Sequence, residues 1–491
     1  MRDIIFTFFN YFVFFYTSML AIFFITFAFL SFISLKRRKD YYVESYMRKT
    51  IKESPYTPGI SVIAPAFNEE KTIIDNVNSM LALEYPLFEV VIVNDGSTDS
   101  TLKKMTEYYE LVEVPYAYIE RIKTRPFRRL LKSSNPKYSR LIVVDKENGG
   151  TKADASNAGI NVASYPYFIC TDVDCILEKY ALYRCISPII SSEKQVIAVS
   201  GTMLMANGCV VKDGQIVDVR TPRTPIPLFQ NLEYMRSYLI GKMGWSAING
   251  MPNVSGGFGL FDRSVAIAAG GYDAPSFAED MDLITRMVGY MCDFSRPYKI
   301  VQIPDTCCWT EGPPNLAMLY RQRTRWARGL FQTLNIHRKM IFKKTYKQMG
   351  LLTLPYMFVF EFLAPIIELV GLIVFIYLAF TGAVNWNTAW MIYLTIYTFC
   401  QFLSIVVITY DYYVGMLYKR GYEYLWIIIA SILEPIFYHP IITFCSLRGY
   451  LSYLTNRDFK WKNMERKGFK QKEESADNTD TTPMKPEPAT I

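Results

Sequence analysis

Histidine is almost absent from this chain of 491 residues, which contains only His337 and His439. A Ser-His-Asp triad or a histidine-based metal site needs imidazole groups that these two positions are nearly unable to supply. The nine cysteines are scattered, and none has the spacing of a zinc finger or zinc ribbon. These shortages leave carboxylates, with lysine and arginine, as the groups available for catalysis.

Charge is missing from long parts of the chain. No charged residue occurs from Ile4 to Leu35, and the basic run Lys36 to Lys39 follows at once. This pattern predicts a membrane helix with a cytoplasmic basic flank. Because the run is too long for a typical secretory signal and lacks a cleavage site of small residues, we expect it to be retained.

Two further apolar blocks lie towards the C-terminus, from Met349 to Asp411 and from Tyr424 to Leu447. The polar turn Thr381 to Asn387 divides the first block into two predicted helices. Pro435 and Pro440 are predicted to break the second block into a re-entrant pair, which would keep the basic tail in the cytoplasm.

These segments predict a protein of the cell membrane whose chain has four parts. Basic residues at both edges of the long central segment place that segment in the cytoplasm. The net charge is +8, and many of the basic residues lie beside the apolar blocks. A lipid bilayer is therefore the expected partner, and nucleic acid is not. The predicted parts are an N-terminal membrane helix at 1–39, a cytoplasmic catalytic domain at 40–334, interfacial and membrane helices at 335–454, and a basic segment with a disordered tail at 455–491.

The central segment alternates between buried-strand patterns and helices. Gly59 to Pro65 and Phe88 to Asn94 are apolar runs, and each is followed by polar loop residues and a helical pattern. Successive βα units of this kind imply a parallel sheet, with ligands beyond the carboxyl ends of its strands. The sequence therefore predicts an α/β, Rossmann-like domain inserted between membrane helices.

An acidic pair ends the fourth predicted strand, where Asp172 and Asp174 follow Tyr167 to Cys170. Two aspartates at this spacing can present hard oxygen ligands to one divalent cation that also binds a diphosphate. A solvated turn explains an isolated pair of this kind more often. Its position, fourth in a series of acidic strand ends, favours the metal site here.

The order of the acidic elements resembles the processive branch of glycosyltransferase family 2, the group of cellulose, poly-N-acetylglucosamine and hyaluronan synthases. That resemblance covers roughly Gly59 to Leu334 and implies a GT-A glycosyltransferase domain. It rests on three separated aspartate elements and a Q-x-x-R-W box, met here by Asp95, by Asp172 with Asp174, by Asp280, and by Gln322, Arg325 and Trp326.

The resemblance also implies a role for each matching residue. Pro65, Glu69 and Asp95 would hold the uridine of a UDP-sugar, and Lys152 would lie near the nucleotide. Asp172 would meet the diphosphate and Asp174 a Mg²⁺ or Mn²⁺ ion. Asp280, next to Glu279, would be the catalytic base, and the box of Gln322, Arg325 and Trp326 would contact the diphosphate and the acceptor sugar.

We therefore expect an inverting, processive β-glycosyltransferase that uses UDP-GlcNAc or UDP-glucose and extends a polysaccharide. Inversion is favoured because no second carboxylate is evidently placed to act as a covalent nucleophile. An accessory export subunit is a further expected partner. Two alternatives stay open, a transferase that adds one sugar to a lipid carrier and an inactive membrane scaffold.

Overall fold

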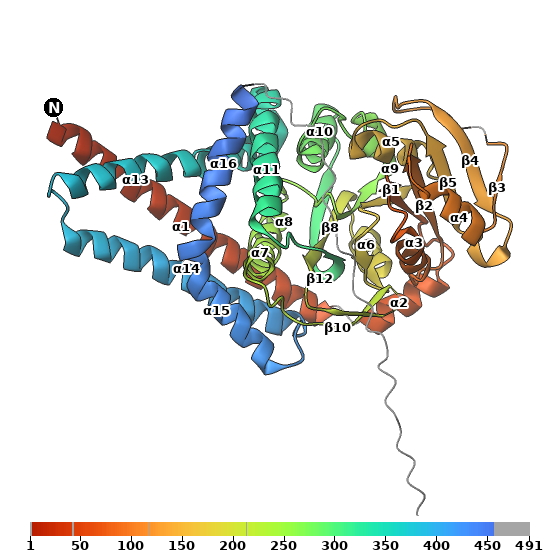
Figure 1. Ribbon diagram of the computed structural model, residues 1–491, viewed down its shortest axis with the longest axis horizontal. Helices are drawn as coiled ribbons and strands as arrows, with labels where there is room; N and C mark the ends of the chain where they lie inside the picture. The colour runs from red at the N-terminus through yellow and green to blue at the C-terminus, as the bar shows by residue number, and fades with distance from the viewer. Residues whose placement is uncertain (1, 42–43, 117, 213, 456–491) are drawn as a thin grey trace, which may run out of the picture.

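A sheet domain and a group of long apolar helices lie at opposite ends of the protein (Figure 1). The computed structural model describes residues 2–41, 44–116, 118–212 and 214–455. Helix α1 (Arg2–Tyr41) runs from the helical end towards the sheet domain. Of the predicted C-terminal segment 455–491, all but Thr455 lies outside the described residues.

Three helical stretches of the described chain are long and apolar enough to cross a membrane, namely Tyr11–Arg37, Met349–Phe380 and Trp386–Val414. A fourth candidate is the pair α15 (Gly421–Phe437) and α16 (His439–Leu454), which bends by 50° between its members. The division of the first block and the break in the second were both predicted from the sequence, and both are confirmed. The re-entrant path of the second block stays a prediction. The second stretch consists of η5 (Met349–Thr353), α12 (Leu354–Tyr356), η6 (Met357–Phe362) and α13 (Ala364–Phe380), and the third is α14 (Trp386–Val414).

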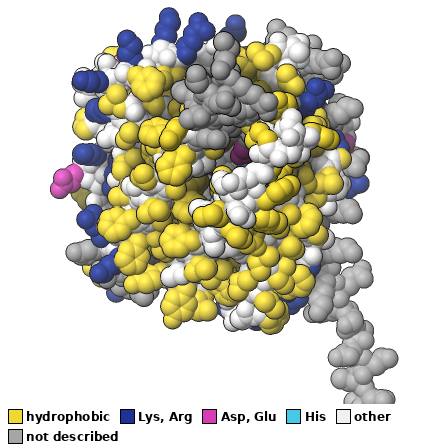
Figure 2. Space-filling view, turned by 90° about the vertical axis from the view of Figure 1, so that its left-hand side faces the viewer, with side chains coloured by type: hydrophobic (Ala, Val, Ile, Leu, Met, Phe, Trp, Pro, Cys, Tyr) yellow, Lys and Arg dark blue, Asp and Glu magenta, His cyan; other side chains and the backbone are white. Residues whose placement is uncertain are grey.

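The helical end presents a largely apolar face (Figure 2). Large apolar side chains stand exposed on it, for example Phe380 at 89% and Met391 at 69%. Lysine and arginine gather at the margins of this view. An exposed apolar face of this kind is what a lipid-facing surface requires.

A ten-stranded sheet forms the other end, in the order β3-β4-β5-β2-β1-β6-β11-β8-β12-β7. A small separate hairpin pairs β9 with β10. The strands are β1 (Ile60–Ala66), β2 (Phe88–Asp95), β3 (Leu111–Glu113), β4 (Phe127–Ser133), β5 (Leu141–Lys146), β6 (Tyr167–Thr171), β7 (Ile176–Leu177), β8 (Gln195–Met205), β9 (Val210–Lys212), β10 (Gln215–Asp218), β11 (Phe258–Asp262) and β12 (Tyr298–Thr310).

The prediction of a parallel sheet is correct for its centre, whereas β3–β4, β4–β5, β12–β7 and both pairs made by β11 are antiparallel. β5, β2, β1 and β6 are parallel, as are β8 and β12. β11 runs antiparallel between β6 and β8, with Phe258 opposite Thr171. The chain enters β11 through a turn that lies at the carboxyl end of β6. β11 therefore starts where β6 ends and runs in the opposite direction. That turn, Ser255–Gly257, therefore lies at the edge where a ligand is expected.

Helices cover both faces of the sheet because alternate strand residues point to opposite sides. Val90 and Ile92 pack in the cluster of α3, α4 and α6, whereas Val91 and Val93 pack in that of α5 and α10. The remaining helices are α2 (Glu44–Glu53), α3 (Ile73–Leu81), α4 (Thr101–Tyr108), η1 (Pro136–Tyr138), α5 (Lys152–Val162), α6 (Ala181–Ile190), α7 (Pro225–Arg236), the π-helix η2 (Ser237–Lys242), α8 (Met243–Ala247), α9 (Arg263–Ala268), α10 (Glu279–Asp293), α11 (Leu316–Ile336), η3 (Arg338–Met340) and η4 (Lys344–Tyr346).

Helix α11 joins the sheet domain to the apolar helices by packing along α16. Gly449 of α16 comes so near that a Cβ atom there would lie 2.6 Å from the carbonyl oxygen of Thr324 and 2.7 Å from Cβ of Ala327. Asn335 also donates to the hydroxyl of Tyr453 at 3.1 Å. The two helices are therefore in direct backbone contact.

Candidate functional site

The acidic pair lies directly beyond β6, at the carboxyl edge of the sheet. One ligand atom each from Asp172, Asp174 and Cys175 can be chosen so that all three lie within 4.8 Å of one another. Carboxylate oxygens are the ligands that Mg²⁺ and Mn²⁺ prefer, whereas a thiol suits softer metals. Asp172 and Asp174 therefore fit a hard divalent cation, and the buried Cys175 is not expected to contribute.

Lys152 connects this acidic pair to the turn that precedes β11. Its Nζ atom lies 2.6 Å from Oδ1 of Asp172 and donates to the carbonyl of Gly256, also at 2.6 Å. Burial alone would lower the pKa of Lys152, but the Asp172 carboxylate opposes this and the pKa lies above its ordinary value. Lys152 is thus a fixed cation at the predicted diphosphate position.

Asp280 binds the same turn. Its Oδ2 atom accepts from the amide of Gly256 at 3.1 Å and from Asn253 Nδ2 at 3.4 Å, while Oδ1 accepts from the amide of Met281 at 2.9 Å. Gly256 therefore meets Lys152 through its carbonyl and Asp280 through its amide. One residue of the turn sets the separation between the predicted diphosphate cation and the predicted base.

Glu279 lies half-buried among the same charged groups. Burial raises the pKa of Glu279 above its ordinary value, the cation of Arg325 lowers it, and the neighbouring Asp280 carboxylate raises it. Lys152 acts in the same direction as Arg325. These interactions place Arg325 of the Q-x-x-R-W box beside Glu279, close to Lys152 and Asp280.

Asp95 belongs to a neighbouring cluster that the sequence did not predict. Lys146 Nζ, which is fully buried, lies 2.8 Å from Asp95 Oδ1 and 2.5 Å from Asp154 Oδ2. The amide of Gly149 also donates to Asp95 Oδ1, at 2.9 Å. Asp95 is therefore held by a lysine and by the glycine loop.

Lys146→Met should destabilise the folded domain by about 3–5 kcal/mol, because two buried carboxylates would lose their shared cation. Thermal unfolding of the purified protein in detergent measures this as a lower Tm. Lys103→Met is the matched control, since Lys103 pairs with Glu107 on the exposed surface and its loss should change Tm little. Equal Tm values for the two variants would contradict the structural role of Lys146.

Pro65 and Glu69 lie at the end of β1, next to the end of β2. Pro65 pairs in register with Val93. Glu69 donates through its amide to the hydroxyl of Thr101 at 2.8 Å, and its carboxylate accepts from Thr72 at 3.2 Å. The structure thus places both predicted uridine residues on the strand ends beside Asp95.

The Q-x-x-R-W box lies on α11. Trp326 is partly buried, and one face of its ring is covered by the guanidinium of Arg323 at 4.4 Å from the centroid. Gln322 accepts from Gln230 of α7 at 3.0 Å. Only the other face of Trp326 can therefore stack on a sugar.

Arg323 was absent from the predicted site, and the structure explains its position. Its Nη1 atom donates to Glu233 Oε1 at 2.6 Å, and its Nη2 atom donates to the hydroxyl of Tyr438 at 2.8 Å. Tyr438 in turn donates to Glu233 at 3.0 Å. This network holds the Arg323 guanidinium against one face of Trp326.

The predicted residues thus separate into groups. Contacts and electrostatic coupling join one set of five, while Asp95, Pro65 and Glu69 lie at neighbouring strand ends. No contact described in the structure joins Gln322 or Trp326 to the acidic residues, although both lie on the helix that carries Arg325. The set of five consists of Lys152, Asp172, Glu279, Asp280 and Arg325. Asp174 belongs with Asp172.

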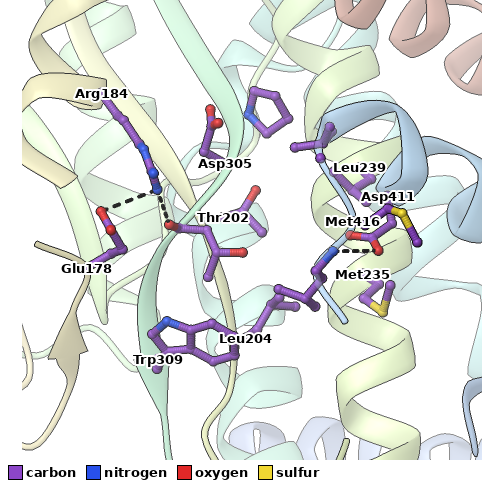
Figure 3. Close-up of a pocket in the computed structure, with 15 residues that line it drawn as sticks. Glu178, Arg184, Thr202, Leu204, Met235, Leu239, Asp305, Trp309, Asp411 and Met416 are labelled. Atoms are coloured by element: carbon purple, nitrogen blue, oxygen red, sulfur yellow. Dashed lines mark hydrogen bonds and ion pairs between the residues drawn. The ribbon is translucent and has the colours of Figure 1, made fainter. Parts of the chain in front are cut away.

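A cavity of about 260 Å³ lies elsewhere, between β8, β12 and the end of α14 (Figure 3). Arg184 approaches Glu178 and donates to the carbonyl of Thr306 at its margin. None of the predicted site residues lines it. Thr202 and Leu204 face the cavity, whereas Met203 between them contacts Ser255 of the turn. Strand β8 therefore separates the cavity from the acidic site.

Two family models match this chain. The model for Glycosyl transferase family 2 matches residues 61–203, and that for Glycosyl transferase family group 2 matches residues 222–444. Together they contain every predicted site residue. The chain belongs to glycosyltransferase family 2. This confirms the family that the order of acidic elements indicated.

Curated relatives of this family 2 chain include poly-β-1,6-N-acetyl-D-glucosamine synthases. The protein from Staphylococcus aureus (strain COL) is 30% identical over 278 residues, which cover 56% of this chain and 55% of the relative. The protein from Staphylococcus epidermidis is 28% identical over 282 residues, or 57% of each chain. The alignment thus spans about half the length of the curated relatives.

The fold of this family 2 chain is similar to that of a mannosyltransferase from Pyrobaculum calidifontis, which was solved in complex with GDP-Man and Mn²⁺. The TM-score is 0.51 with 16% sequence identity, covering 90% of this chain and 99% of the other. The predicted fold class, an α/β GT-A domain flanked by apolar helices, is confirmed.

Proposed function

We propose that this chain is an inverting glycosyltransferase that transfers sugar from a nucleotide-sugar to a growing polysaccharide at the membrane. The observation that carries the proposal is the turn at Gly256, which binds Lys152 through its carbonyl and Asp280 through its amide. A cation for the leaving group and a base for the acceptor are thus held by one peptide segment.

Asp280 is the base in this mechanism. It takes the proton from the acceptor hydroxyl while that oxygen attacks the anomeric carbon of the donor. The bond from the anomeric carbon to the diphosphate breaks, and its electron pair leaves with the diphosphate. Attack from the face opposite the leaving group converts an α-linked donor into a β-linked product.

The cations of Lys152 and Arg325 stabilise the charge that develops on the leaving diphosphate. Glu279 is half-buried, and the charges of both cations act on its carboxylate. A Mg²⁺ or Mn²⁺ ion, when bound by Asp172 and Asp174, supplies further positive charge at the same place.

The expected donor is a UDP-sugar, with UDP-GlcNAc preferred to UDP-glucose. Pro65, Glu69 and Asp95 at adjacent strand ends would hold the uridine. The names of the curated relatives support N-acetylglucosamine as the sugar and a polymer as the product. The remaining face of Trp326 offers a stacking surface for the end of that polymer.

A donor panel tests the function. Detergent-solubilised protein is incubated with UDP-GlcNAc, UDP-glucose and GDP-mannose, with Mg²⁺ or Mn²⁺, and released nucleotide and product length are measured. We expect UDP release with UDP-GlcNAc and a long product that a linkage-specific hydrolase digests. Absence of nucleotide release with every donor would identify a scaffold, and a lipid carrying one sugar would contradict polymer synthesis.

The catalytic domain should lie in the cytoplasm of a multi-pass membrane protein, facing the UDP-sugar pool. Ser139→Cys in the exposed part of the domain should react with an impermeant thiol reagent only after cells are opened. Ala383→Cys, in the exposed turn between α13 and α14, should react in intact cells and serves as the matched control. The reverse labelling pattern would refute this orientation.

A further inference from the structure

Lys242 is a buried lysine that neither the sequence patterns nor the mechanism above uses. It is the last residue of the π-helix η2 and is only 7% exposed. Its Nζ atom lies 4.6 Å from the centroid of the Tyr238 ring. Within the described parts of the chain, no hydrogen bond or ion pair to this ammonium group is recorded.

A largely buried ammonium group without a hydrogen-bond partner is unfavourable, because it has lost much of its hydration shell. Contact with one aromatic face compensates only part of that loss. π-Helical turns are frequently found at functional sites. The Lys242 ammonium group is therefore available to donate a hydrogen bond to an oxygen atom of a ligand.

The surroundings of Lys242 lead directly to the proposed base. Tyr238 packs in the same buried cluster as Met203 and Phe258, and Met203 contacts Ser255. The next residue, Gly256, donates to Asp280. The charge of Asp280 acts on both Tyr238 and Lys242. Lys242 thus lies within electrostatic range of Asp280 and reaches its neighbourhood along η2, whereas Lys152 reaches it through Gly256.

The position of η2 indicates which substrate Lys242 meets. Among the elements that contact η2 are the membrane helix α1, α8, α14, β8 and β12. The hydroxyl of Ser31 in α1 donates to the carbonyl of Leu239, one turn before Lys242. The donor-binding groups lie instead at the ends of β1, β2 and β6. Lys242 therefore approaches Asp280 from the membrane side, where a growing polymer has to lie.

We propose that Lys242 is a further catalytic residue that donates a hydrogen bond to the acceptor sugar, at the hydroxyl from which Asp280 takes the proton. This inference rests on the transferase function proposed above. The proton passes from the acceptor oxygen to the Asp280 carboxylate, and Lys242 keeps its own protons. The ammonium charge stabilises the negative charge that develops on the attacking oxygen.

The charge state of Lys242 provides a readout that a structural role would not change. Burial lowers the pKa of Lys242 to about 8, and Asp280 opposes the shift. Asp280 on α10 and Tyr238 on η2 are the titratable groups that face it among the described residues. Because the ammonium form is the active one, transfer should fall as the pH rises through about 8.

Lys242→Met should lower kcat/KM for the acceptor by about tenfold to a hundredfold, since a charged hydrogen bond to the reacting atom is lost. The Kd for UDP-sugar should change less than about twofold, because donor groups are untouched. Lys242→Arg keeps the charge, so it should retain part of the transfer activity and lose the decline near pH 8. Lys212→Met, on an exposed strand, is the control.

Unchanged transfer by Lys242→Met, with the same decline at high pH, would overturn the role of Lys242 alone. If Lys242→Met does not fold, a decline near pH 8 that persists in Lys242→Arg overturns it equally. If the unmodified protein releases no nucleotide with any donor, the transferase function itself fails and this inference fails with it.

Discussion

Asp280→Asn should lower kcat for sugar transfer by about 10² or more while the Kd for UDP-sugar stays within about twofold. The asparagine keeps the size of the side chain and an oxygen that can accept from the amide of Gly256 or Met281. It cannot take a proton from the acceptor. Rapid-quench turnover and equilibrium donor binding, measured on the same preparation, separate the two effects.

Asp293→Asn is the matched control for this variant. It makes the same chemical change at the other end of α10, on an exposed residue. Its turnover should equal that of the unmodified protein. If Asp280→Asn loses donor affinity and keeps its turnover at saturating donor, Asp280 is not the base and the proposed mechanism is wrong.

Trp326→Ala provides a useful contrast, because it removes a stacking surface without changing the base. Polymer synthesis should fall, whereas slow hydrolysis of the donor by water should persist. The ratio of hydrolysis to polymerisation should therefore rise in Trp326→Ala relative to Asp280→Asn. A similar ratio in both variants would contradict the separate assignment of the two residues.

The second large effect is expected at the acidic pair. Asp174→Asn, and separately removal of divalent cations with EDTA, should each abolish measurable transfer, because the diphosphate would leave without the charge of the bound cation. Adding Mg²⁺ or Mn²⁺ back should restore the EDTA-treated protein and leave Asp174→Asn inactive. Thermal unfolding checks that Asp174→Asn remains folded.

Glu193→Gln controls for the loss of a carboxylate, since Glu193 lies exposed on the domain surface. It should respond to EDTA and to added metal as the unmodified protein does. Full turnover in EDTA would remove the metal from the mechanism and leave Lys152 and Arg325 as the only cations at the diphosphate.

Local sequence patterns were sufficient for the centre of the domain. β1, β2, β5 and β6 are short apolar runs, and the polar residues that follow them fall at one edge because parallel strands share their direction. The family motif then supplied Asp280 and the box on α11. These predictions depend on residues close together in the sequence or on a known order of motifs.

Distant contacts could not be read in this way. Arg323 and Glu233 are 90 residues apart, and nothing in either local pattern indicates their pairing. Lys146 is a charged residue at the end of an apolar strand. Its role is evident only from the structure, in which Asp95 lies beside it. The direction of β11 is likewise decided by its neighbours in the sheet, because strand propensity contains no information on orientation.

The close approach of α16 to α11 has a mechanical consequence. Gly449 leaves no room for a side chain between its backbone and that of Thr324, so a tilt of α16 is expected to move α11 as well. Helices in a bilayer change their tilt when the thickness of the surrounding hydrocarbon changes. Trp326 lies two residues beyond Thr324, so the thickness of the lipid should set the height of its ring above the donor. Elongation in bilayers of short-chain and long-chain lipids should therefore proceed at different rates.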